Sequence, residues 1–164
     1  MGFREMRRKN QALSPEECAA VLARGTSGVL ALAGDDGYPY AVPMSYIADG
    51  GKIYFHCAVT GHKLDAIRSS DKASFCVIDQ DQVIPERFTT GFRSVIAFGR
   101  IRIMEEDGER RMALEKLAEK YSPHILPAKT QEEIRDGWGR VCLLEFSVEH
   151  LSGKEGRELA ENRQ

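Results

Sequence analysis

The chain has 164 residues, and 23 Lys and Arg against 25 Asp and Glu give it a formal net charge of −2. This even balance disfavours nucleic-acid-binding proteins, which are usually clearly basic. With 42% apolar and 29% charged residues, the composition excludes a disordered chain and is typical of one folded domain with its own apolar core.

The four cysteines are too widely spaced for a C-x-x-C metal or redox motif, since the two nearest in sequence, Cys57 and Cys76, are 19 positions apart. We therefore expect no metal site. No segment is apolar over the roughly 20 residues that a membrane span needs, and the first residues lack the apolar core of a signal peptide. We expect a cytoplasmic protein with reduced thiols and no contact with membranes.

Residues 1–13 are polar and carry a small basic cluster at positions 4–9. We interpret them as an N-terminal arm, which is either a solvated leader or a segment that lies over a partner subunit. A helix follows, because Ser14 is a typical N-cap, Pro15 suits the first helical position and Glu17 completes a capping box. This helix is expected to end at 24, before Gly25.

Six segments then have the composition of β-strands, several of them separated by turn sequences. They cover residues 27–33, 38–47, 52–57, 73–79, 92–104 and 140–150. Pro39 and Pro43 interrupt the second segment, which predicts an edge strand or a bulged one because proline cannot donate to a β-ladder. Gly99 predicts a bulge in the fifth.

Helical segments lie between some of these strands. The pattern predicts a short helix over 61–69 and a second over 113–121 that ends before Pro123. Thr130 and Glu133 have the spacing of a capping box for a third. Because regular βαβ alternation and a G-x-G-x-x-G motif are missing, a parallel dinucleotide-binding sheet is disfavoured. The predicted fold is α+β, a six-stranded antiparallel β-barrel with short flanking helices.

Residues 55–65 (FHCAVTGHKLD) run from a strand into the first turn of a helix. His62 and Lys63 there place positive charge at the positive end of the helix dipole, where Asp or Glu is usual. A phosphate would reverse the cost, since free N–H groups, the Lys63 ammonium and the Thr60 hydroxyl can bind it together. The alternative is that both basic side chains extend into solvent.

Two further segments could complete a ligand site. In 41–46 (AVPMSY) the proline leaves backbone groups without ladder partners, and these can bind the edge of a flat heterocycle. At the start of the fifth strand, Arg93 and Ser94 offer a guanidinium fork and a hydroxyl to an anion. Each segment also has a structural explanation: edge prolines protect against aggregation, and an Arg-Ser pair at a strand start is commonly on the surface.

Two single residues are candidates of the same kind. His56, near the end of the third strand, is either a ligand contact or a structural histidine. Trp138, between two glycines, either covers a ligand or a neighbouring subunit, or packs in the core. The sequence has no H-x-x-x-H motif, paired carboxylates or nucleophile elbow, which disfavours metallohydrolases and serine hydrolases.

Five short motifs follow one another in a specific order. They are 6–9 (MRRK), 54–58 (YFHCA), 61–65 (GHKLD), 92–95 (FRSV) with 98–99 (FG), and 152–155 (SGKE). Together they resemble the nitroimidazole-resistance branch of the pyridoxamine-phosphate-oxidase-like, flavin-binding split-barrel family. The resemblance implies a six-stranded split barrel and a homodimer with FMN, or FAD, at the subunit interface. We divide the chain into the arm (1–13), a split-barrel domain (14–156) and a C-terminal tail (157–164).

The resemblance also implies which residues contact the ligand. Lys63 with His62, and the pair Arg93 and Ser94, look like phosphate contacts, and His56 matches a histidine close to the cofactor or substrate. The residues that look like the edge meeting the isoalloxazine ring are Val42, Pro43, Met44, Ser45 and Tyr46.

The implied function is flavin-mediated reduction, in which electrons from NAD(P)H reach a small acceptor such as a nitroimidazole. His56 would orient or protonate that acceptor. Vitamin B6 oxidation is not expected, because no clear counterpart to the substrate-phosphate pocket of the true oxidases is found. The alternatives are a non-catalytic flavin-binding protein, a haem-binding relative with His56 or His62 as axial ligand, and DNA binding by the basic arm.

Overall fold

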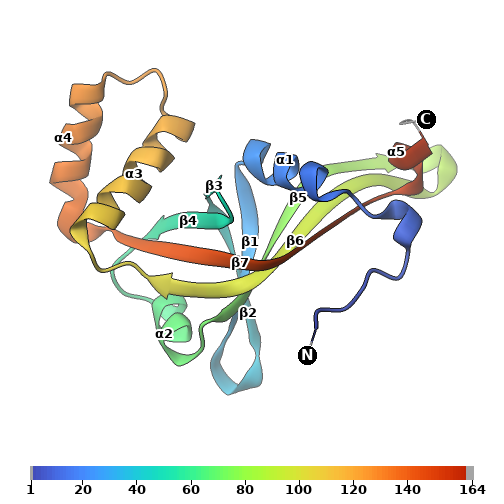
Figure 1. Ribbon diagram of the computed structural model, residues 1–164, viewed down its shortest axis with the longest axis horizontal. Coiled ribbons are helices and arrows are strands. Elements are labelled where there is room, and N and C mark those ends of the chain that lie inside the picture. The colour runs from blue at the N-terminus through green and yellow to red at the C-terminus, as the bar shows by residue number, and fades with distance from the viewer. Residues whose placement is uncertain (1, 162–164) are drawn as a thin grey trace.

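The protein, described over residues 2–161 by a computed structural model, is built on one antiparallel sheet flanked by helices (Figure 1). The strands are β1 (Ser27–Ala33), β2 (Pro39–Ser45), β3 (Ile47–Asp49), β4 (Lys52–Cys57), β5 (Lys72–Ile84), β6 (Thr89–Ile103) and β7 (Cys142–Glu155). The helices are α1 (Pro15–Arg24), α2 (His62–Ser69), α3 (Asp107–Tyr121), α4 (Pro127–Gly137) and α5 (Arg157–Glu161). The α+β class is confirmed. The expected number of six strands is wrong, because the predicted strand 38–47 is divided at Tyr46 and the described chain forms seven.

The order of strands in the sheet is β2-β1-β5-β6-β7-β4-β3. The two edge strands, β2 and β3, are consecutive in sequence with only Tyr46 between them. Since one residue spans at most about 3.6 Å, the two edges must come together and the sheet must curl on itself. Within residues 2–161 no ladder joins β2 to β3, so the sheet is open in its hydrogen bonding and split at this seam.

β2 is an edge strand, as its prolines predict, and it pairs only with β1 in the described sheet. Pro39 and Pro43 lie opposite Ala33 and Val29. Their nitrogens must point away from β1, because proline has no N–H to give to the ladder. Backbone groups alternate along a strand, so the odd-numbered residues 39–45 turn their remaining polar backbone groups to the outer edge.

Two local predictions about backbone shape are confirmed. The register of β6 on β7 shifts between Phe98 and Gly99, which is the predicted bulge. A Cβ atom at Gly99 would lie 1.9 Å from the carbonyl oxygen of Ser147, so only glycine fits. At α1, the Ser14 hydroxyl accepts a hydrogen bond from the Glu17 N–H, and the Glu17 carboxylate accepts one from Ser14, which closes the capping box.

The predicted capping box at Thr130 is wrong. α4 begins a turn earlier, at Pro127, and its N-cap residue Leu126 supplies no side-chain hydrogen bond. Proline at the first helical position has its φ angle already set for a helix, and this signal prevails over the Thr130 spacing. The prediction that the preceding helix ends before Pro123 is confirmed, because α3 ends at Tyr121.

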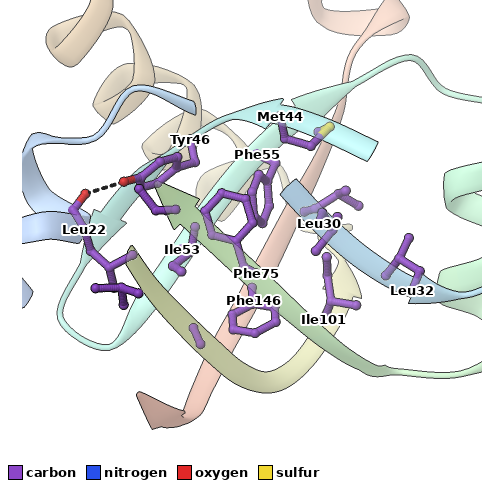
Figure 2. Packing of buried hydrophobic residues seen from close by; sticks show 14 of the residues in the cluster. Leu22, Leu30, Leu32, Met44, Tyr46, Ile53, Phe55, Phe75, Ile101 and Phe146 are labelled. Carbon is purple, nitrogen blue, oxygen red and sulfur yellow. Dashed lines mark hydrogen bonds between the residues drawn. The ribbon is translucent and has the colours of Figure 1, made fainter. Parts of the chain in front are cut away.

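Aromatic side chains fill the inside of the curled sheet (Figure 2). The Phe75 ring meets Tyr46 and Phe55 edge-on, with centroids 4.9 Å and 5.1 Å away. α1 and α2 pack into this core as well, and Leu64 and Ile67 of α2 are buried there. A second apolar cluster lies outside the barrel, where α3 covers the outward-facing side chains Tyr54 and Leu143 of β4 and β7.

The seam at Tyr46 is fastened by both α1 and α3. The Tyr46 hydroxyl donates to the Leu22 carbonyl at 2.7 Å (Figure 2). Its backbone N–H lies 3.0 Å from the Tyr121 hydroxyl, which is itself 2.6 Å from the Tyr46 carbonyl. Lys120 donates to the carbonyls of Tyr46 and Gly25, and burial lowers the pKa of this ammonium group. The last turn of α3 therefore holds the two edges of the sheet together.

The N-terminal arm and α5 lie away from α3 and α4 (Figure 1). In the arm, the Phe3 ring stacks on His150 of β7 with centroids 4.7 Å apart, so the arm rests on its own sheet in this chain. The tail is described only as far as α5, which contacts β6. Residues 162–164 of the predicted tail lie outside the described residues.

Candidate functional site

A cavity of about 590 Å³ lies between the barrel and the helix pair α3–α4. Two of the predicted site residues line it: Ser45 at the end of β2 and His56 on β4. His56 lies opposite Leu143 in the β4–β7 ladder and faces outward, whereas its neighbour Phe55 is buried in the barrel. The structure thus brings together two residues that the sequence placed in separate segments.

Most of the cavity wall comes from helices that the sequence did not connect with the site. Its aliphatic part is formed by Leu114, Leu117, Ala118, Ile125, Ile134 and Val141. Tyr121 also lines the cavity, although its hydroxyl is already engaged at the Tyr46 seam. The only relevant signal in the sequence was the four-residue apolar spacing that predicted α3.

The start of α2 forms a second, smaller pocket of about 190 Å³, lined by the predicted residues Thr60, His62 and Lys63. The N-cap Gly61 has φ 141° and offers no side-chain hydrogen bond to the helix. The Gly61 carbonyl accepts hydrogen bonds from the N–H groups of residues 64 and 65. The N–H groups of His62 and Lys63 have no acceptor in the described chain. Two free amides, an ammonium and a hydroxyl therefore meet here, a set of donors suited to an anion.

His62 is less available than Lys63. Its ring stacks on Tyr40 with centroids 4.0 Å apart, and its Nε2 lies 3.7 Å from the Asp35 carboxylate. These contacts explain a histidine at a helix start without a ligand. Lys63 makes no ion pair with the described residues.

Cys57 also lines the α2 pocket and lies opposite Cys142 in the β4–β7 ladder. Burial raises the pKa of the Cys57 thiol to about 11, so it is protonated and a poor nucleophile near neutral pH.

Arg93 lies elsewhere, in a buried ion-pair network. Its Nη1 is 3.0 Å from Asp79 and its Nε is 3.1 Å from Glu155. Arg24 of α1 binds the same Asp79 carboxylate through two hydrogen bonds of 2.7 Å. The Arg24 and Arg93 guanidinium groups hold the pKa of Asp79 below its ordinary value. The Ser94 side chain lies on the face of β6 opposite to that of Arg93 and the fully buried Val95, because successive side chains of a strand alternate.

The side chains of the segment 42–46 also lie on two opposite faces of the sheet. Val42 packs against the core, and Met44 and Tyr46 are buried in it, so their side chains cannot meet a ligand outside the barrel. Pro43 and Ser45 face outward. Both backbone groups of Tyr46 are bonded within the chain. What this segment offers a heterocycle is the free outer edge of β2.

Trp138 is the first residue of a short 3₁₀ helix, Trp138–Arg140. The guanidinium of Arg110 lies 4.1 Å from its ring centroid, and that of Arg111 lies 5.4 Å away. Arg110 also donates to the Trp138 carbonyl at 2.9 Å. Trp138 lines a separate pocket beside α3, whereas the preceding Gly137 lines the large cavity.

This architecture, an antiparallel sheet curled on itself and split at one seam with helices packed outside one end, defines the class of split-barrel proteins. The sequence profile described as pyridoxamine 5′-phosphate oxidase matches residues 14–155. The chain belongs to this family, which confirms the resemblance seen in its sequence. No curated protein matches the chain.

Solved structures share the fold. A protein from Bacteroides thetaiotaomicron assigned to 5-nitroimidazole antibiotic resistance is 14% identical, with a TM-score of 0.71 over 93% of this chain and 96% of that one. An FAD-binding protein from Mesorhizobium loti is 26% identical, with a TM-score of 0.62 over 89% and 97%. An FAD and haem binding protein from Mycobacterium smegmatis is 22% identical, with a TM-score of 0.74 over 91% and 74%. Among residues 2–161, no helix has the length and apolarity to cross a membrane.

Proposed function

We propose that the protein binds a flavin, FMN, between two copies of the chain and uses it to reduce a small acceptor with electrons from NAD(P)H. The observation that carries this proposal is the anion site at the start of α2. There the N–H groups of His62 and Lys63, the Lys63 ammonium and the Thr60 hydroxyl converge on one pocket. Structural neighbours named as FAD-binding proteins support a flavin cofactor.

The outer edge of β2 and Ser45 are suited to contact the flavin ring. The outer edge of β2 presents free backbone donors and acceptors, which match the polar edge of a flat heterocycle. Ser45 lies at the end of that edge and also lines the large cavity. Arg93 already forms ion pairs with Asp79 and Glu155. We therefore assign the phosphate to Lys63 and propose a bracing role for Arg93, in which its ion pairs stabilise the fold.

A second copy of the chain would cover the outer face of β1, β5 and β6. The ladder places Val29 beside Cys76 and Cys76 beside Ile96 on this face. Val29, Ile78 and Phe98 are exposed on it, and a contiguous apolar face of this kind is typical of a subunit interface. We therefore propose a homodimer. Ile78→Glu should yield monomers in size-exclusion chromatography with light scattering, whereas Leu126→Glu, an equally apolar and exposed position on the α3–α4 loop, should leave the dimer intact.

A bound flavin would supply two-electron transfer: NAD(P)H would lose a hydride to become NAD(P)⁺, and the acceptor would gain the two electrons and one proton of that hydride together with a second proton from solvent. The chain contributes His56, whose imidazole makes no hydrogen bond to the described residues and faces the large cavity. From this position it can donate a hydrogen bond, or a proton, to an acceptor oxygen.

The test compares FMN with riboflavin, which lacks the phosphate. Lys63→Glu should weaken FMN binding at least about 10-fold, because one charge-assisted hydrogen bond is worth roughly 1.5–3 kcal/mol. Riboflavin binding should stay unchanged. Arg68→Glu makes the same change of charge in the last turn of α2 and should leave both affinities as they are. Mass spectrometry of the released cofactor would distinguish FMN from FAD.

Three outcomes would contradict the proposal. If FMN binds Lys63→Glu as tightly as it binds the unaltered chain, the phosphate is held elsewhere. If the purified protein neither contains nor takes up a flavin, the family's fold serves another purpose here. If anaerobic NADPH leaves the yellow colour of the bound flavin unbleached, the protein is a passive flavin carrier and not a reductase.

A further inference from the structure

We propose that the cavity between the barrel and the α3–α4 pair is the acceptor subsite, and that it selects an uncharged, conjugated ring compound bearing a hydrogen-bond-accepting oxygen, as quinones do. This inference rests on the proposed function, since it names the compound class that the reductase would reduce. It is also separable from that function, because the cavity and the α2 anion site share no lining residue.

The size of the cavity and its aliphatic wall favour a ligand with an apolar ring. Its volume of about 590 Å³ is within the usual range of about 300–1,000 Å³ for small-molecule sites. Leu117 and Ile134 are buried residues of its wall, and Ile125 borders it from the loop between the helices. Water beside such side chains lacks hydrogen-bond partners, so its displacement by an apolar ring is favourable.

The polar groups of the cavity are placed on one side. Ser45 and His56 come from the strands, while the aliphatic side chains come from α3, α4 and Val141. Neither the His56 imidazole nor the Ser45 hydroxyl has a hydrogen-bond partner among residues 2–161. A ligand that places an oxygen atom toward β4 and its ring toward the helices would satisfy both sides. The cavity therefore orients its ligand with the oxygen next to His56.

The charges of the lining favour a neutral ligand. Its permanently charged side chains are Lys129 and Glu133 of α4, one of each sign, and neither forms an ion pair in the described chain. A phosphate or carboxylate would find no excess of positive charge here, in contrast to the start of α2 with Lys63. A conjugated ring compound that carries no net charge can take up two electrons, because its π system accepts them. An uncharged ring with an oxygen substituent meets these requirements together.

The test uses flavin-free protein and 2-methyl-1,4-naphthoquinone as the probe. The chain has one tryptophan, Trp138, next to Gly137 in the cavity wall, so binding should quench its fluorescence in a saturable way. Ala118→Phe places a ring in the cavity and should weaken binding at least about 10-fold. Ala128→Phe is the same change at an exposed position of α4 outside the lining and should leave the affinity unchanged.

A second variant tests the polar contact without filling the cavity. His56→Leu should lower the affinity for the quinone by about 2- to 10-fold, the range expected for one hydrogen bond. Its affinity for 2-methylnaphthalene, measured by displacement of the quinone, should not fall, because that ring has no oxygen. His56 is exposed, so this variant should fold even if Ala118→Phe does not, and circular dichroism checks both.

Several results would overturn the inference. One is equal quinone affinity in Ala118→Phe and the unaltered chain. Another is equal binding of a naphthoquinone sulfonate, which carries a negative charge. A third is the loss of FMN binding in Ala118→Phe, which would assign the cavity to the flavin while leaving the proposed function intact. Conversely, a protein that binds the quinone but no flavin would retain the subsite and refute the reductase.

Discussion

Replacing Arg93 by Met should destabilise the protein even when no ligand is present. The change removes the hydrogen bonds to Asp79 and Glu155, whose side chains are only 10% and 5% exposed. Breaking a buried ion pair costs about 3–5 kcal/mol. Arg24 still binds Asp79 and Glu155 keeps a further contact, so we expect a smaller loss of about 2–3 kcal/mol.

Urea unfolding of the flavin-free protein, followed by Trp138 fluorescence, measures this difference. In a chain of this length the same loss lowers the melting temperature by roughly 5–10 °C. Arg100→Met is the matched control, because Arg100 lies on the same strand and pairs with Asp71 and Glu149 at the surface. Its unfolding midpoint should stay at that of the unaltered protein.

The difference should also depend on pH in a defined direction. The folded pKa of Asp79 is lowered by Arg24 and Arg93, so its contribution to stability is present above the unfolded value of about 3.9 and is lost as the pH falls through the folded value. The gap in unfolding free energy between Arg93→Met and the unaltered chain should have its whole value at pH 7 and become smaller below about pH 4. A gap under about 0.5 kcal/mol at pH 7 would refute the bracing role and return Arg93 to the candidates for a phosphate contact.

Three further substitutions test the framework around the site. Tyr46→Phe leaves a buried helix-end carbonyl without its donor and should cost about 1–3 kcal/mol in urea unfolding, while Tyr38→Phe, at an exposed ring, should change nothing measurable. Gly99→Ala forces a methyl group against the backbone of β7; we expect a loss of about 3 kcal/mol or more, seen as a lower yield of soluble protein and a lower melting temperature. Gly108→Ala, with open space around it in α3, should instead raise stability by about 0.5–1 kcal/mol. Ser14→Ala removes the cap of α1 and should cost about 1 kcal/mol; an unchanged melting temperature would show that the capping box contributes nothing.

Features set by neighbouring residues could be predicted from the sequence. The edge position of β2 follows from the missing N–H groups of Pro39 and Pro43, and the bulge follows from Gly99. The capping box at Ser14 is equally local. The start of α4 was not predictable in this way, because two valid signals, Pro127 and Thr130, competed within one turn.

Features set by distant contacts could not be predicted. The sequence shows Arg93 as a free guanidinium at a strand start, yet its partner Glu155 lies 62 positions away. Likewise, nothing near His56 indicates that the helices after residue 106 will build a cavity over it. Tyr46 falls inside the predicted strand 38–47, because a strand pattern does not reveal that the residues before and after it belong to the two edge strands of the sheet.

The last turn of α3 performs two tasks at once, and this constrains how the family fold can diversify. Lys120 and Tyr121 fasten the seam, and Tyr121 is also part of the cavity wall. A substitution there alters ligand preference only by loosening the barrel. α4 does not hold the seam together in the described chain: Thr130 and Glu133 border the cavity, whereas the hydrogen bonds at Tyr46 come from α1 and α3. Laboratory evolution toward new acceptors should therefore accumulate changes in α4 and leave the end of α3 untouched.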